Sequence, residues 1–169
     1  MEMQTIQDNK SLPTSEEGVN QFLTFELNSE TYGIDILDIK EIIDRCSITR
    51  VPMMPDAIAG VINLRGSVVP VVDLALRFSQ QPIPATKRSS IVILEIEHEG
   101  VKVEIGVTVD VVNEVLNIKS GDVEVAPSFG AEIRTDFISG MGKVNNSLLM
   151  LLNVETILSI DELSLIEEI

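Results

Sequence analysis

Hydrophobic and polar residues alternate along most of the chain, and the spacing is mostly two. Alternation with this period is typical of β-strands that have one buried face. The predicted strands cover residues 22–27, 31–34, 61–64, 67–72, 91–96, 101–109 and 148–152. Many short strands separated by turn residues indicate an all-β fold, either a barrel or a sandwich.

Turn and cap residues add detail to this pattern. The Arg65-Gly66 pair separates two apolar runs and predicts a tight hairpin. Pro70 has no amide hydrogen, so its strand is expected to be an edge strand or to be bulged there. Asp73 and Asn153 each follow an apolar run and are expected to cap short helices. We assign residues 153–169 to a C-terminal helical segment.

The chain contains an internal repeat in two parts. Residues 33–43 match residues 106–116, and residues 60–74 match residues 140–154, with glycine and aliphatic positions coinciding. Two matches in the same order predict a duplicated small β-barrel. Lobes of about 70 residues have marginal cores alone, so we expect them to pack on each other.

The repeat predicts one domain over residues 21–159. Its barrel lobes are expected at about 21–85 and 86–152, with strands that can be exchanged between the lobes. The polar residues 1–20 lack periodicity and are expected to form a flexible acidic tail.

One hairpin differs between the two copies in a chemically informative way. Arg65-Gly66 in the first copy corresponds to Asn145-Asn146 in the second. Because Asn-Asn suffices for a tight turn, the turn does not require arginine. A guanidinium suits bidentate contact with carboxylates, which makes Arg65 a candidate anchor for an acidic partner. The alternative is a solvated arginine at an exposed tip.

Charge and composition exclude several function classes. The 169 residues include 27 acidic and 12 basic ones, for a net charge of −15. Such a chain repels nucleic acids and anionic lipids. No apolar run reaches the roughly 18 residues of a membrane span, so no membrane insertion is expected. The single cysteine, Cys46, and the single histidine, His98, predict neither a disulfide nor a metal site.

Catalytic motifs are missing as well. The sequence has no Gly-x-Ser-x-Gly elbow and no phosphate-binding loop. Carboxylates such as Asp35, Asp38 and Glu41 leave a small β-barrel hydrolase open, although they are explained more simply as polar faces of apolar segments. A nucleic-acid-binding module is the other alternative, which the charge disfavours.

Three segments together resemble the CheW family of bacterial chemotaxis coupling proteins. They are Tyr32-Gly33-Ile34-Asp35-Ile36, Asn63-Leu64-Arg65-Gly66 and Val69-Pro70-Val71-Val72-Asp73-Leu74. The resemblance extends from about residue 21 to about residue 159. It implies an all-β fold with short helices, in which two tandem SH3-like five-stranded β-barrels pack on each other. It implies neither catalysis nor a cofactor.

The resemblance also implies a function. Members of this family act as adaptors between the cytoplasmic tips of methyl-accepting chemoreceptors and the regulatory domain of the CheA histidine kinase. The chain is therefore expected to be a cytoplasmic scaffold held at the inner face of the membrane through receptor arrays, and a monomer in isolation. A CheW-like adaptor of a non-flagellar chemosensory pathway is the alternative. Because the family includes fusions to a receiver domain and this chain ends at Ile169, we expect the stand-alone form.

The resemblance implies a receptor-binding set as well. Its residues are Ile39, Glu41, Gly60, Asn63 and Arg65. The kinase-binding residues are not defined by a motif. An apolar edge of Val68, Val69 and Val71 is a candidate, with plain core as the alternative. Val111 stands where relatives often have glycine. This departure bears on whether the second barrel has the family's turn or bulge at this position.

Overall fold

The computed structural model describes residues 18–44, 46–78, 89–125, 135–159 and 163. The described strands form two sheets. The first has the strand order β8 (Val111–Lys119), β1 (Val19–Leu27), β2 (Glu30–Asp35), β11 (Ser147–Leu152), β10 (Ile138–Val144) and β9 (Val123–Glu124). The second has the order β3 (Ile39–Asp44), β6 (Ser90–His98), β7 (Val101–Val109), β5 (Ser67–Asp73) and β4 (Ile58–Leu64). The predicted all-β fold with two SH3-like barrels is confirmed.

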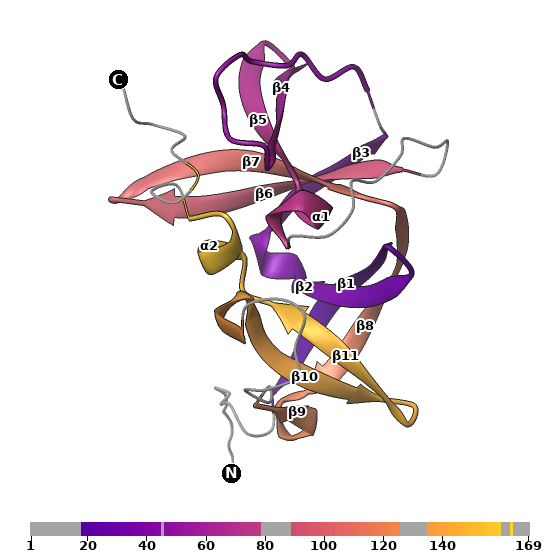
Figure 1. Cartoon of the computed structure of the whole chain (residues 1–169). Coiled ribbons are helices and arrows are strands. Elements are labelled where there is room, and N and C mark those ends of the chain that lie inside the picture. The colour runs from indigo at the N-terminus through magenta and orange to yellow at the C-terminus, as the bar shows by residue number, and fades with distance from the viewer. Residues whose placement is uncertain (1–17, 45, 79–88, 126–134, 160–162, 164–169) are drawn as a thin grey trace.

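Each sheet builds one lobe, and we call them lobe 1 (first sheet) and lobe 2 (second sheet). Lobe 2 is continuous in sequence, whereas lobe 1 combines β1 and β2 with β8–β11. The two lobes lie one above the other in Figure 1. The boundary expected near residues 85 and 86 therefore does not separate them, because the chain crosses between lobes after β2 and again after β7. Strands are thus shared between the halves of the chain.

The predicted N-terminal tail and the predicted C-terminal helical segment fall only partly within the described residues. β1 begins at Val19, so the last two residues of the expected tail belong to a strand, and residues 1–17 lie outside the described residues. The C-terminal helical segment is described as α2 (Val154–Ile157), and most of its remainder, residues 160–162 and 164–169, also lies outside them.

The structure repeats as the sequence repeats. β4 pairs with β5, and β10 with β11, each pair with a register shift at the glycine that begins the matched segment, Gly60 or Gly140. β5 then lies parallel to β7, and β11 lies parallel to β2. In both copies the hairpin therefore lies against the equivalent strand, which is β7 in lobe 2 and β2 in lobe 1.

A short sixth segment lies at the edge of each lobe in the same way. In lobe 1, β9 pairs with β10 and places Glu124 opposite Met141. In lobe 2, Thr49 forms an isolated antiparallel bridge with Val61, which is the repeat equivalent of Met141. We call Ile48–Thr49 the strap. With the strap included, the edge beside β4 in lobe 2 matches the edge beside β10 in lobe 1.

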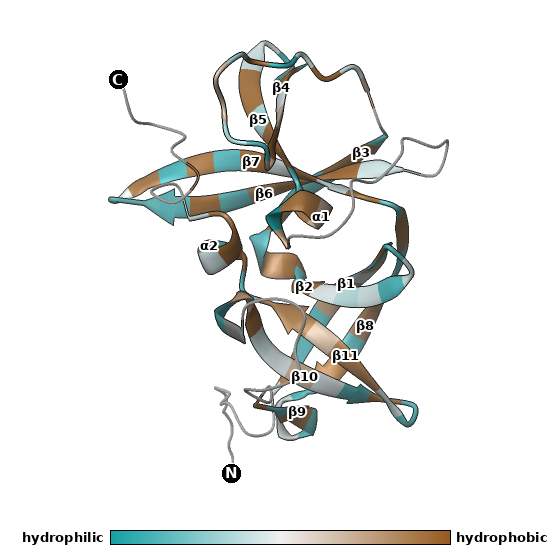
Figure 2. Cartoon of the chain, in the orientation of Figure 1, coloured by the Kyte–Doolittle hydropathy of each residue, from teal (hydrophilic) through white to brown (hydrophobic). Residues whose placement is uncertain are grey.

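The main core lies between the lobes. It includes Phe25 and Tyr32 of lobe 1 and Leu94 and Ile105 of lobe 2, each at most 1% exposed. Smaller apolar clusters fill each barrel, around Ile62 and Ile93 in lobe 2 and around Phe22, Ile118, Leu149 and Leu151 in lobe 1. Brown and paler or teal bands alternate along β7 in Figure 2, as expected for a strand whose side chains point to opposite faces.

Two short helices join the lobes at this core. The side chain of Asp73 accepts a hydrogen bond from the Leu76 amide to begin α1 (Leu74–Arg77), and Asn153 begins α2 in the same way. Arg77 at the end of α1 donates through Nε to the carbonyl of Ile157 at 2.6 Å. Arg77 therefore ties α1 to α2. No helix in the described part of the chain is long and apolar enough to cross a bilayer.

Candidate functional site

The most exposed part of the predicted site is the β4–β5 hairpin tip. Arg65 and Gly66 form its turn with φ values of 52° and 89°, as the tight hairpin prediction requires. Asn63 accepts a hydrogen bond through Oδ1 from the Gly66 amide at 2.9 Å. Asn63 therefore holds the turn that presents Arg65.

Glu41 on β3 faces this tip. Both terminal nitrogens of Arg65 contact the Glu41 carboxylate, and Nη1 donates to Oε2 at 3.1 Å. The arginine lowers the pKa of Glu41 below its ordinary value, chiefly through this hydrogen bond. The side chain of Arg65 is 65% exposed. The guanidinium is therefore oriented by Glu41 and still open to solvent.

The other two residues of the predicted set lie deeper. Ile39 is half-buried at the start of β3 and packs against the main core. Gly60 is buried in β4 at the register shift, with φ of +149°. The structure therefore brings Glu41, Asn63 and Arg65 together at a surface tip and places Ile39 and Gly60 at deeper positions away from that tip.

The candidate kinase-facing edge divides in two. Val68 is 70% exposed, whereas Val69 and Val71 are 2% and 0% exposed in the core of lobe 2. Val69 and Val71 cannot touch a partner in the folded state, so Val68 alone of the three is available. β5 is also flanked by β4 and β7, although β7 pairs only with residues from Val71 onward. Pro70 therefore lies in the half of β5 that has a single partner strand.

Lys40 continues the charged surface of β3. Its ammonium contacts Glu104 of β7 and lies 3.9 Å from Oε2 of Glu95 on β6. The hydrogen bond to Glu104 is the main cause that raises the pKa of Lys40. Adjacent residues of β3 are thus engaged in separate ion pairs, Lys40 with the strands of the sheet and Glu41 with the hairpin tip.

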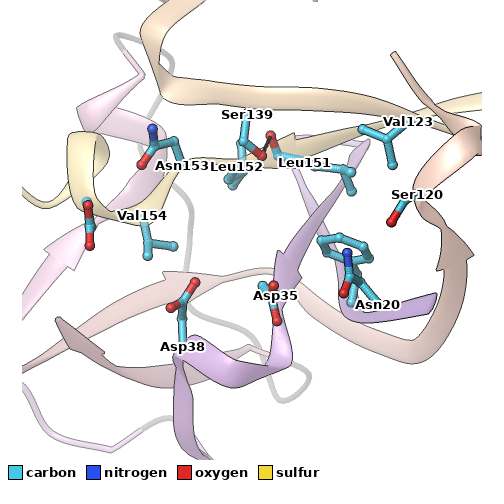
Figure 3. Close-up of a pocket in the computed structure, with 12 residues that line it drawn as sticks. Asn20, Asp35, Asp38, Ser120, Val123, Ser139, Leu151, Leu152, Asn153 and Val154 are labelled. Atoms are coloured by element: carbon cyan, nitrogen blue, oxygen red, sulfur yellow. Dashed lines mark hydrogen bonds between the residues drawn. The ribbon is translucent and has the colours of Figure 1, made fainter. Parts of the chain in front are cut away.

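A pocket of about 580 Å³ lies elsewhere on the molecule, where β1 and the end of β2 meet β11 and α2. Figure 3 shows Asp35 and Asp38 on one side, with Leu152, Asn153 and Val154 opposite. Burial raises the pKa of Asp38, and the nearby carboxylates of Asp35 and Glu155 raise it further. None of the five predicted receptor-binding residues lines this pocket. Within the described residues no group of histidine, cysteine and carboxylate side chains could hold a metal ion.

Sequence reasoning missed two features of this region. It named Glu41 and Arg65 but did not predict that they pair, because they are 24 positions apart and lie on strands of unknown order. It also missed the strap. The only signal was the shared glycine, Gly60 in one copy and Gly140 in the other, since Ile48-Thr49 and Val123-Glu124 have little in common as sequences.

Val111 has an ordinary backbone conformation. It begins β8 and is not among the residues with positive φ. The adjacent Asp110 accepts a hydrogen bond from the Asn28 amide at 2.8 Å. The crossing into β8 therefore does not need glycine, and a β-branched residue fits it.

Two small β-barrels that share one apolar core define a protein of the tandem SH3-like barrel class. The model of the CheW-like domain matches residues 21–162. The chemotaxis protein CheW of Klebsiella aerogenes is 36% identical over 149 residues, covering 88% of this chain and 87% of the relative. CheW of Bacillus subtilis is 32% identical over 139 residues, covering 82% and 86%.

A solved structure agrees with these relatives. The scaffolding protein TtCheW from Thermoanaerobacter tengcongensis superimposes with a TM-score of 0.75 at 32% identity, covering 90% of this chain and 93% of that one. The chain belongs to the CheW family. Membership confirms the predicted class, a chemotaxis adaptor rather than an enzyme.

Proposed function

We propose that the chain is a non-enzymatic scaffold that couples the cytoplasmic tips of chemoreceptors to the regulatory domain of a CheA-type histidine kinase. It would act in the cytoplasm, held near the membrane by the receptors. Holding both partners in fixed geometry lets a small shift in the receptor bias the population of active kinase. Tethering also raises the effective concentration of each partner for the other.

One observation carries this proposal, the construction of the β4–β5 tip. Arg65 has φ of 52°, in the left-handed region that residues other than Gly, Asn and Asp rarely adopt. The equivalent turn of lobe 1 uses Asn145 and Asn146, at φ of 49° and 67°. Arginine is thus placed where the backbone favours another residue, and its partner Glu41 keeps the guanidinium oriented outward. Strain of this kind often accompanies function.

The partner that fits this tip carries a carboxylate on an exposed surface. Arg65 uses its two terminal nitrogens on Glu41 and can bind a second acceptor through its remaining N–H groups. Asn63 and Gly66 fix the turn, so little freedom is lost on binding. We assign the receptor tip to this surface, with Glu41, Asn63 and Arg65 at its centre and Ile39 and Gly60 as support.

The kinase is assigned to the adjoining β5 side of the same hairpin, where Val68 is the cross-strand partner of Asn63. Val68 is an exposed aliphatic residue on the half of β5 that pairs with β4 alone. Exposed apolar positions on a partly unpaired strand suit contact with another β-barrel. The kinase-facing surface is therefore proposed to include Val68, without Val69 and Val71.

The test replaces Arg65 by alanine and compares the variant with Asn145→Ala, the matched position of the other turn. Arg65→Ala should weaken binding of a receptor-tip fragment by about tenfold or more, the range for loss of a charged hydrogen bond. It should also lower receptor-dependent kinase autophosphorylation in a reconstituted mixture. Asn145→Ala should change neither. Equal binding by Arg65→Ala and wild-type protein, both folded by circular dichroism, would contradict the proposal.

A further inference from the structure

The two residues of the tip ion pair come from strands that do not adjoin. Glu41 lies on β3 and Arg65 follows β4, and these strands are the two ends of the order β3-β6-β7-β5-β4. The two end strands are not hydrogen-bonded to each other. A bidentate contact between Arg65 and Glu41 therefore needs something else that fixes β3 relative to β4.

The strap supplies this connection. The Thr49 amide donates to the Val61 carbonyl at 2.9 Å, and the Val61 amide donates to the Thr49 carbonyl at 2.8 Å. Ile48 packs on the apolar cluster of lobe 2, where Ile43 of β3 also packs. The strap follows β3 in the chain and is hydrogen-bonded to the middle of β4, so it links the two end strands of the sheet through the chain and through the shared apolar cluster.

Gly60 leaves the space that the strap occupies. A Cβ atom on Gly60 would lie 2.2 Å from the Thr49 carbonyl oxygen and 2.8 Å from Cγ2 of Ile48. The first contact is with backbone, which cannot rotate away. Any side chain at position 60 would therefore push the strap off β4.

We propose that the strap, seated over Gly60, is the positioning element that sets the spacing of β3 and β4 and so aligns Glu41 with Arg65. Thr49, Ile48 and Gly60 are positioning residues in this account, and none of them touches the partner. The inference deepens the proposed function and rests on it only where receptor binding is concerned.

Lobe 1 provides an internal control. Gly140 is the equivalent of Gly60, and a Cβ there would lie 2.7 Å from Cγ1 of Val123 in β9. β9 closes lobe 1 as the strap closes lobe 2. At the matched turn, however, Asn145 replaces arginine, so there is no guanidinium to align. Damage to the closing segment of lobe 1 should therefore perturb the fold without changing the tip.

The first experiment needs no partner. The Glu41 carboxyl is titrated by carbon-detected NMR in the full-length wild type and in Gly60→Ala, Ile48→Ala, Gly140→Ala and Val123→Ala. Because Arg65 lowers the pKa of Glu41, separation of the pair should bring that pKa back toward the ordinary value for glutamate in the two lobe 2 variants. The two lobe 1 variants should keep the wild-type value.

An unchanged Glu41 titration in Ile48→Ala, or the same change in all four variants, would overturn the positioning role. Ile48→Ala and its match Val123→Ala decide the matter even where a glycine variant does not fold, because they remove methyl groups without creating a backbone clash.

The second experiment separates this inference from the proposed function. Ile48→Ala should weaken binding of a receptor-tip fragment about tenfold, as Arg65→Ala does, whereas Val123→Ala should not. A shifted Glu41 titration with unchanged receptor binding would support the strap as a positioning element and overturn the tip as the receptor site. Weaker binding with an unshifted titration would overturn the strap mechanism while leaving the tip in place.

Discussion

At the scale of single residues, the informative positions are those where chemistry and backbone preference disagree. The turns at Arg65 and Asn145 have nearly the same φ, 52° and 49°, and asparagine adopts that conformation more readily than arginine. The comparison is internal to one chain, so the difference is not an effect of fold. Arg65 is therefore best explained by what its side chain contacts, which in the free protein is Glu41.

Asp38 is a second residue whose surroundings oppose its chemistry, because they disfavour its charged form. This predicts that the stability of the protein depends on pH. Burial, Asp35 and Glu155 all raise the pKa of Asp38, so the folded protein binds this proton more tightly than the unfolded chain does. The stability from this group is fully present below the ordinary aspartate pKa and is lost as the pH rises through the folded pKa. Asp38→Asn should therefore increase the free energy of unfolding at neutral pH.

Urea denaturation of Asp38→Asn and wild-type protein across the acidic range measures this effect. The stability difference should shrink as the pH falls through the raised pKa of Asp38 in the folded protein, and it should be smallest below the ordinary pKa of aspartate. Glu155→Gln should lower the pKa of Asp38, followed by NMR, since it removes one of the charges that raise it. A stability difference that is independent of pH would contradict this account of the pocket.

At the scale of elements, the same hairpin-plus-cap unit occurs twice. β4–β5 leads into α1 through Asp73, and β10–β11 leads into α2 through Asn153. The amides of these two cap residues donate at 2.7 Å to Ala57 and Phe137, respectively. Each cap therefore fixes both the end of a strand and the start of a helix at the contact between lobes.

Removal of one cap tests this unit. The Oδ1 atom of Asn153 accepts from the Thr156 amide at 3.2 Å. Asn153→Ala should lower the free energy of unfolding by about 0.5–2 kcal/mol, the usual cost of losing an N-cap. Asn153→Ser keeps an acceptor and should recover most of the loss. Guanidinium denaturation measures both variants, and equal stability of the alanine and serine variants would argue against the cap.

Much of this element scale could be predicted from the sequence. Period-two alternation located seven of the described strands and missed β3, β8, β9 and β10. Turn residues located the hairpin at Arg65-Gly66 and the helix starts at Asp73 and Asn153, because these signals are local. The alternation did not tell exposed from buried valines, so Val68, Val69 and Val71 were grouped although only Val68 is exposed. Burial depends on which strands adjoin, and that is not a local property.

At the scale of the whole molecule, each lobe takes strands from both halves of the chain. The sequence did not define this arrangement. The repeat predicted two lobes, but the division followed the sequence order, whereas β1 and β2 belong with β8–β11. The pairing of Glu41 with Arg65 was missed for the same reason. Sequence alternation carries no information about which distant strands meet.

A shared core also predicts how the protein unfolds. Leu94 of lobe 2 is 1% exposed, and it belongs to the cluster that includes Phe25 and Tyr32 of lobe 1. Leu94→Ala should cost about 2–5 kcal/mol, the range for truncation of a buried leucine. Because both sheets bury their inner faces against this cluster, the loss should weaken them together and leave a single unfolding transition.

Native-state amide exchange resolves the two sheets separately and measures this coupling. In Leu94→Ala, the most protected amides of β1 and β11 in lobe 1 should lose as much protection as those of β6 and β7 in lobe 2. Val101→Ala, at a residue 61% exposed, is the control and should change stability by less than about 0.5 kcal/mol. Protection retained in lobe 1 while lobe 2 opens would show that the lobes fold as separate units.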